Sequence, residues 1–587
     1  MNDKRMPENV LYIDLSKKSF KIEKRPQLFR ENLGGIGVAM KLLLEECPQG
    51  IDPFDPQNPI VFAVGPLTCL FPLASKTVAV FKSPHTGNLG ESHAGGRSAV
   101  SIRMAGYGAI VIKGASNIPV YLAIHGDKVY FRDASTLWGM GSNFTVGRVI
   151  REHERGAGLR TIMRIGRAGE NLVSYACVTT ESYRHFGRLG LGAVFGSKKL
   201  KALVVSGKSS IQLENSGEYR KLYDEIYREA VESEVMKKYH DLGTSSNILP
   251  LNELGALPNE NLRTARSIHA GEISGERFAE DFLGRRLACS HCPVGCIHIA
   301  ALREPYEDEP YFYKTSMISY DYEPIYAIGN MLGSYNPAGI LKLMDRIEAL
   351  GLDVMSTGVV LAWATEAMEE GLISKKETTG LNLKWGYYQD YIQATEYITS
   401  QPNEFYRVLA KGVGNASEKY GGEDYALAYG GNEMPGYHTG PAAHIGFAVG
   451  TRHSHLDNAG YSIDQKHLGE KLLSPEELGE NLLKEERWRQ ILCSLVLCLF
   501  ARGIYTPERT TRALLAAGAD RMDEKALMEL GKKIHSEKYK FKIKEGYMGE
   551  TAGIPQRVLQ TPSPWGKLDE EYIRKTISYI HSASLNQ

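Results

Sequence analysis

The chain has 587 residues, and its composition, 43% apolar and 24% charged, is that of an ordinary globular protein. At about 100–200 residues per domain, the length predicts three or four domains. The 69 basic and 69 acidic side chains cancel, so the total charge does not indicate a nucleic-acid-binding protein. No apolar run is long enough to span a bilayer, and the N-terminal segment has no secretory apolar core. We therefore expect a cytoplasmic protein with no membrane or nucleic-acid partner.

The first 210 residues carry the pattern of a β-rich domain. Residues 10–24 alternate apolar and polar side chains around a Lys17-Lys18 turn, which predicts an opening β-hairpin. Glycine-rich turns separate many of the later runs of apolar, β-branched residues. We expect strands at 60–64, 77–81, 109–112, 120–124 and 202–205.

From about residue 214 the pattern changes to that of helices. Apolar side chains recur with helical spacing in residues 216–240, 337–353 and 358–373. We therefore predict an α+β fold with a β-rich N-terminal domain followed by two mainly α-helical domains. The expected boundaries are 1–210, 211–420 and 421–587.

Three of the eight cysteines lie within one short segment, which indicates a metal or cluster site in a reducing compartment. The spacing is Cys289-x2-Cys292-x3-Cys296, and soft thiolate ligands select iron–sulfur clusters or zinc. A cluster held by four cysteines needs one more ligand. The only later cysteines in the sequence are Cys493 and Cys498.

Zinc is the alternative to a cluster for this segment. Structural zinc sites are usually built from paired cysteine or histidine sets, and the sequence shows no obvious second pair. His291 and His298 could nevertheless complete four ligands, so the zinc alternative stays open.

Several segments, in matching order and spacing, resemble the aldehyde:ferredoxin oxidoreductase family over almost the whole chain. Residues 66–114 resemble the family's first pterin-contacting region. RIGRAGENLVSYACVTT (164–180) followed by FGRLGLGAVFGSKKLKA (186–202) resembles its most recognisable block. EALGLDVMSTG (348–358) resembles its D-x-x-G-L-D pterin motif, and CSLVLC (493–498) stands where the family has D-x-x-G-L-C.

The resemblance implies a tungsten or molybdenum bis-pyranopterin buried between the domains, with one [4Fe-4S] cluster beside a pterin. A magnesium ion between the pterin phosphates is an option. The four cluster ligands would be Cys289, Cys292, Cys296 and Cys498. The positions that match cofactor-binding residues are Lys76, His93, Gly95, Arg188, Leu189, Gly190, Glu348, Leu352, Asp353, Cys493 and Leu497.

Some of these positions depart from the family pattern, which indicates a divergent branch. Lys76 replaces an Arg and His93 an Asn, while Glu348 and Cys493 stand where Asp is usual. A thiol accepts hydrogen bonds from pterin N–H groups poorly, so either the pterin is held differently or Cys493 has another task. Asp353 is expected to hydrogen-bond a pterin from the start of a loop that follows a helix over 337–350.

Two residues match the family's active-site pair. They are Glu323, in YDYEPIYAIGN, and His455, in GTRHSHLDNAGYSID, and we expect both in one pocket although 131 residues lie between them. One would take a proton or activate water, and the other would orient a carbonyl oxygen. Glu181 and His185 are further catalytic candidates. They lie four residues apart, either on one helical face that points into the cavity or as a solvated pair.

The activity that the resemblance implies is oxidation of an aldehyde to a carboxylic acid. A ferredoxin or a ferredoxin-like iron–sulfur subunit would accept the electrons, and the other partner would be a small-molecule substrate. A homodimer is left open, without the family's bridging iron, because Lys342 stands at the position of a ligand. One alternative is a reductase similar to the class II benzoyl-CoA reductase catalytic subunit. A second is an iron–sulfur electron-transfer protein without a pterin.

Overall fold

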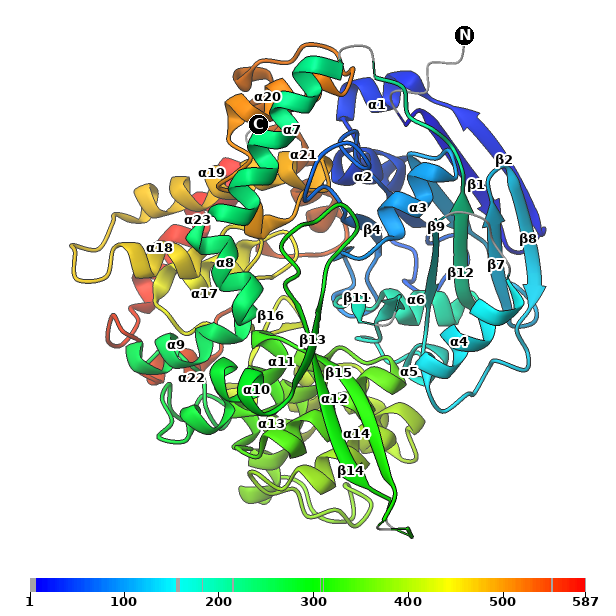
Figure 1. Ribbon diagram of the computed structural model, residues 1–587. Coiled ribbons are helices and arrows are strands. Elements are labelled where there is room, and N and C mark those ends of the chain that lie inside the picture. Colours follow the sequence, from blue (N-terminus) through cyan, green and yellow to red (C-terminus); the bar gives the residue numbers. More distant parts are fainter. Residues whose placement is uncertain are drawn as a thin grey trace.

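The computed structural model describes residues 7–154, 159–181, 183–213, 216–306, 308–309, 311–549 and 553–585 (Figure 1). Two six-stranded sheets occupy the first 207 residues, and helices dominate the rest of the described chain, so the predicted α+β fold is confirmed. Figure 1 shows the sheets on one side, in blue and cyan, with the helical regions beside and below them. Within the described part of the chain, no helix is both long and apolar enough to cross a membrane.

The first sheet has the strand order β2-β1-β6-β3-β4-β5. The predicted opening hairpin is confirmed, with Asn9 paired to Lys24. Strands β3 and β4 are buried on both faces, which explains their continuous apolar runs. The strands are β1 (Asn9–Asp14), β2 (Ser19–Lys24), β3 (Ile60–Ala63), β4 (Thr77–Lys82), β5 (Leu89–Ala94) and β6 (Ala109–Lys113).

The second sheet has the order β11-β10-β9-β12-β7-β8. An apolar core lies between the two sheets, where the ring of Phe62 contacts those of Phe186 and Phe195. Strands β5 and β11 lie close together, so an edge of the first sheet lies beside an edge of the second. The strands are β7 (Val120–His125), β8 (Lys128–Asp133), β9 (Leu159–Arg164), β10 (Val178–Thr180), β11 (Arg184–Phe186) and β12 (Leu200–Gly207).

The predicted helices form with shifted boundaries. The periodic run 216–240 is two helices, α7 (Ser216–Glu232) and α8 (Glu234–Asp241), because the Ser233 side chain caps α8 by accepting from the Met236 amide. Helix α12 (Pro337–Leu350) ends at Gly351, which adopts the left-handed conformation with φ 79°. Helix α13 (Val354–Glu369) begins four residues before the predicted run.

A three-stranded sheet inside the helical part is not predicted from the sequence. It consists of β13 (Leu283–Leu287), β14 (Ile297–Pro305) and β15 (Tyr313–Tyr320), with β13 at one edge. The hairpin of β14 and β15 projects at the bottom of Figure 1. The segment between β13 and β14 carries the three clustered cysteines, so this small sheet positions them.

The C-terminal part packs directly on the first sheet. Helix α19 (Pro475–Ser494) lies against α2 (Gly35–Glu46), and the two share a core with the faces of β3 and β4. The backbones meet closely: a Cβ atom on Gly65 would lie 2.7 Å from the Leu495 carbonyl oxygen. Only glycine permits this approach, which brings the segment after α19 beside the first sheet.

Candidate functional site

The structure brings together four cysteines from two distant segments. Burial raises the pKa of the Cys292 and Cys296 thiols to about 12, and repulsion from Cys498 and Cys289 contributes to both shifts. Backbone hydrogen bonds through Leu73 hold the two segments in place. The Cys498 amide donates to the Leu73 carbonyl at 2.9 Å, and the Leu73 amide donates to the His291 carbonyl at 3.0 Å. Four neighbouring cysteine sulfurs, which would lose their protons when metal binds, fit an iron–sulfur cluster.

The geometry does not favour the zinc alternative. Both ring nitrogens of His298 face backbone carbonyls, with Nδ1 3.2 Å from the Cys296 oxygen and Nε2 3.1 Å from the His240 oxygen. Zinc–sulfur bonds of about 2.3 Å would hold the sulfurs about 4 Å apart. Among the described residues, no three of the cysteine sulfurs lie within 4.8 Å of one another. The described cysteines are therefore not preorganised for a single zinc ion.

Two predicted cofactor positions border the cysteines. A Cβ atom on Gly95 would lie 2.7 Å from Cys289 Sγ and 3.4 Å from Lys76 Nζ, so glycine leaves room for the sulfur. The Lys76 amide donates to the Val496 carbonyl at 3.1 Å. Leu497 is buried, and its amide donates to the Leu492 carbonyl at 2.9 Å.

A cavity of about 190 Å³ opens beside this cysteine site. Its walls contain four buried polar atoms that lack a partner among the described residues: Arg184 Nε, His185 Nε2, Arg188 Nη1 and Glu348 Oε2. Unpaired buried donors and acceptors are costly unless a ligand satisfies them. A flat molecule with several ring nitrogens and an exocyclic amine, such as a pterin, fits this mixture. The other predicted residues in the walls are Glu323, Leu352 and Asp353.

The two carboxylates of the EALGLD segment have different environments. Burial raises the pKa of Glu348 to about 8, and Ser319 Oγ donates to Oε1 at 3.0 Å. Asp353 caps α13 by accepting from the Ser356 amide, and it pairs with Arg188 Nε at 3.1 Å. The expectation that Asp353 begins a loop is therefore wrong: its carboxylate satisfies the free amides of a helix start. It still lines the cavity.

The glycine-rich segment 187–196, inside the FGRLGLGAVFG sequence, contributes only partly to the cavity. Gly187 and Arg188 line it, whereas Leu189 and Gly190 pack behind it. Ser83 Oγ donates to the Leu189 carbonyl at 2.8 Å. Gly190 has φ 84°, and a Cβ atom there would lie 2.0 Å from the Ser174 oxygen, so close packing explains this glycine.

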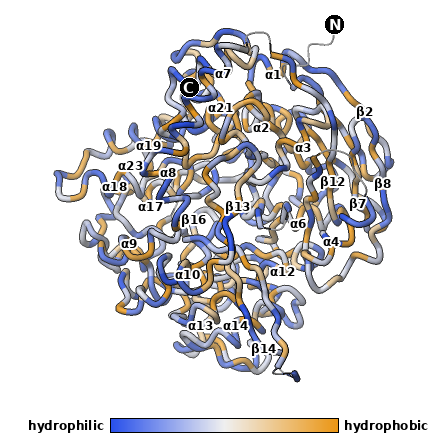
Figure 2. Tube along the Cα trace, in the orientation of Figure 1, coloured by the Kyte–Doolittle hydropathy of each residue, from blue (hydrophilic) through white to orange (hydrophobic). Residues whose placement is uncertain are grey.

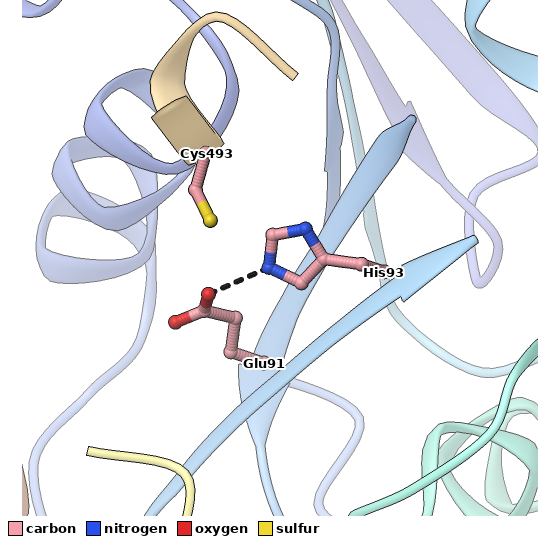
Figure 3. A group of neighbouring side chains, drawn as sticks. All are labelled: Glu91, His93 and Cys493. Carbon is pink, nitrogen blue, oxygen red and sulfur yellow. Dashed lines mark hydrogen bonds and ion pairs between the residues drawn. The ribbon is translucent and has the colours of Figure 1, made fainter. Parts of the chain in front are cut away.

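A second polar group forms around Cys493. Glu91 and His93 project from β5 toward Cys493 at the end of α19, and Glu91 Oε1 lies 2.7 Å from His93 Nε2 (Figure 3). The three ligand atoms lie within 4.8 Å of one another. Lys538 Nζ, however, lies 2.6 Å from Glu91 Oε2, and Arg452 Nη1 lies 3.8 Å from Oε1. These cations neutralise the carboxylate, so the group does not favour a metal cation.

Cys493 therefore acts here as a neutral thiol. Burial raises its pKa to about 11, so the thiol is protonated at neutral pH. It can donate a weak hydrogen bond where the family's Asp would accept one. The sequence reasoning missed Glu91, Lys538 and Arg452. The spacing of Glu91 and His93, two apart on one strand, is the signal that would have indicated a shared face.

Glu323 and His455 lie together although they are far apart in the chain. His455 Nε2 is 3.1 Å from Glu323 Oε1, and the Tyr437 hydroxyl donates to the same oxygen at 3.1 Å. Burial by itself would raise the pKa of Glu323, but the contact with His455 holds it below its usual range. The sequence reasoning missed Asp321, which also lines the cavity. Burial and the charge of Glu323 raise the pKa of Asp321 to about 7.

Glu181 and His185 do not share a helical face, and that expectation is wrong. Glu181 follows β10 with φ 58°, accepts from Thr161 Oγ1 at 2.5 Å and pairs with Arg97 at 3.1 Å. His185 lies on β11 and lines the cavity, where burial lowers its pKa to about 3. The short strands separate the two side chains, so only His185 reaches the cavity.

Comparisons with known proteins match nearly the whole chain. The family described as "Aldehyde ferredoxin oxidoreductase, N-terminal domain" matches residues 10–207, and "Aldehyde ferredoxin oxidoreductase, domains 2 & 3" matches residues 221–581. The tungsten-containing aldehyde ferredoxin oxidoreductase of Pyrococcus furiosus is 31% identical over 571 residues, which cover 94% of this chain and 91% of the relative. That of Thermococcus kodakarensis is 31% identical over 576 residues, covering 95% and 92%.

The fold is also similar to that of a solved structure. It is a chain of the active site complex BamBC of benzoyl coenzyme A reductase bound to 1,5-dienoyl-CoA, with a TM-score of 0.84 and 21% identity. The match covers 99% of this chain and 94% of that one. At this identity the likeness shows the fold alone.

Proposed function

Because the chain belongs to the aldehyde ferredoxin oxidoreductase family, we propose that it is a tungsten or molybdenum bis-pterin oxidoreductase that converts an aldehyde to a carboxylic acid. The reaction consumes one aldehyde and one water and releases one carboxylic acid, two protons and two electrons. Two molecules of an oxidised ferredoxin would each accept one electron. The metal–pterin group, when bound, would supply the two-electron chemistry.

Some residues around the cavity would hold the cofactor, and others would transfer protons. Arg184, Arg188 and Glu348 present unpaired polar atoms that would hold one pterin, and His93 and Cys493 would face the other. A [4Fe-4S] cluster would be held by Cys289, Cys292, Cys296 and Cys498. The assignment of Arg184, Arg188 and Glu348 follows from polar atoms that the protein itself leaves unsatisfied, and the other assignments follow from the family resemblance.

Proton transfer belongs to the group around Glu323. The ionised Glu323 would accept a proton, with His455 orienting it or passing the proton on. Tyr437 fixes the carboxylate through its hydroxyl, and Asp321 is a second acceptor in the same cavity. The observation that carries the proposal is this contact of Glu323, His455 and Tyr437 beside a polar cavity and four cysteines.

An assay with aldehydes tests the proposal. The holoenzyme, purified without oxygen, is mixed with benzyl viologen and a series of aliphatic and aromatic aldehydes. We expect aldehyde-dependent dye reduction and formation of the matching acid. The proposal fails if no aldehyde reduces the dye while an aromatic acyl-CoA thioester is reduced by the same preparation.

One observation favours the alternative of a reductase. Asp321 has a pKa near 7, so at neutral pH it is partly protonated and can donate a proton to a reduced substrate. His185 offers an unpaired ring nitrogen in the same cavity. Reduction of an acyl-CoA thioester by reduced ferredoxin, without activity toward aldehydes, would support this alternative.

A further inference from the structure

Strand β13 presents two adjacent arginines beside the cysteine site. Gly284, Arg285 and Arg286 are all exposed, and Figure 2 shows a hydrophilic stretch within this strand. Arg286 donates to the Asp241 carbonyl at 3.1 Å, and Arg285 lies 3.5 Å from the Tyr183 hydroxyl. Neither has a carboxylate partner among the described residues, so both charges face solvent without neutralisation.

These charges lie where the cysteine site reaches the surface. Two residues separate Arg286 from Cys289, so their Cα atoms, three steps apart along the chain, are at most about 11 Å apart. Ala288 and His291 in the same segment are exposed, and the Ser290 amide donates to the Gly96 carbonyl at 2.8 Å. The cysteine segment therefore reaches solvent next to the arginine pair.

We infer that the exposed edge of β13, with Arg285 and Arg286, is the docking surface for a small acidic iron–sulfur protein that receives electrons from the four-cysteine site. The inference rests on the proposed function. One electron would leave a reduced cluster in this chain and reduce the oxidised partner, without proton transfer. Arginines without a carboxylate partner, beside the place where electrons would leave the protein, attract an acidic partner and orient it toward the cluster.

Arginines on an edge strand also have a purely structural explanation. Charged side chains protect an edge from pairing with another strand. This role depends on charge of either sign, so it predicts that replacing both arginines by glutamate leaves electron transfer unchanged. A docking role predicts that the same charge reversal slows electron transfer, so one variant separates the two roles.

The test uses the holoenzyme carrying Arg285→Glu and Arg286→Glu. Each preparation is reduced with dithionite, freed of excess reductant and mixed in a stopped-flow instrument with an oxidised ferredoxin of net negative charge. We expect the second-order rate constant at low salt to fall about tenfold or more and its dependence on salt to flatten. Iron content and dithionite-linked reduction of the cluster should be unchanged.

The control is Lys375→Glu with Lys376→Glu, an exposed adjacent basic pair after helix α13. It changes the net charge equally and should leave the rate constant unchanged. An unchanged rate constant and salt dependence in the Arg285/Arg286 variant would overturn the inference. The inference is also overturned if the wild-type protein is a dimer and this variant dissociates it. If the wild type holds no reducible iron, the proposed function fails, and the inference fails with it. Absence of aldehyde activity alone leaves the docking result intact.

Discussion

At the scale of single residues, Glu323 is held by two donors on one oxygen, with His455 and Tyr437 each 3.1 Å away. We predict that Glu323→Gln and His455→Asn each lower kcat by about 10²–10⁴ because a positioned proton acceptor is lost. Steady-state dye reduction measures this, and metal analysis checks that iron and tungsten or molybdenum are retained. Near wild-type turnover in both variants would rule out the proton-transfer assignment.

The two C-terminal cysteines have different surroundings, and this gives a second prediction. Cys498 repels the thiols of Cys292 and Cys296, whereas Cys493 faces Glu91 and Arg452. We expect Cys498→Ser to lose or alter the paramagnetic signal of the reduced cluster and Cys493→Ser to keep it. Electron paramagnetic resonance and iron analysis measure this difference. The reverse pattern would show that Cys493, not Cys498, is the fourth cluster ligand.

Asp321 gives a prediction about pH. Burial and the charge of Glu323 raise its pKa to about 7, so the carboxyl accepts protons only above that pH. For aldehyde oxidation we expect turnover to increase as the pH rises through about 7, and Asp321→Asn to remove this step. For the reductase alternative the sign reverses, because the protonated acid is then the active form. A pH profile with no difference between wild type and variant would exclude Asp321 from proton transfer.

At the scale of elements, the sequence predicted the helices and strands that depend mainly on interactions between neighbouring residues. The opening hairpin and helix α12 follow from alternation, helical period and a terminal glycine. The sequence did not predict the break between α7 and α8, although Ser233 is a typical helix-capping residue. Strands β10 and β11 are only three residues long, which is too short for a periodic signal. The placement of His185 on a helix failed for that reason.

Close packing between elements gives a stability prediction. A Cβ atom on Gly65 would lie 2.7 Å from the backbone of Leu495, which cannot move away without shifting α19. Gly65→Ala should lower stability by about 1–3 kcal/mol, as overpacking does. Gly141→Ala is the control, since its Cβ would meet nothing within 4 Å. Equal thermal midpoints for the two variants would contradict the packing argument.

At the scale of the whole molecule, the site joins residues that the sequence separates widely. The resemblance indicated most of the positions, but it could not indicate the partners that they meet. Lys538 lies in the lysine-rich helix α21 (Glu524–Lys544), which has the composition of a solvated helix, yet it is buried against Glu91 of β5. Only the packing of α21 on the first sheet reveals that this charge is neutralised inside the protein.

The central claim is that this chain holds a metal–pterin group and an iron–sulfur cluster together. Metal and pterin analysis of anaerobically purified protein tests it most directly. We predict about one tungsten or molybdenum, about four iron atoms and extractable pterin per chain. Iron and sulfide with no tungsten, molybdenum or pterin would contradict the account and support an iron–sulfur electron-transfer protein instead.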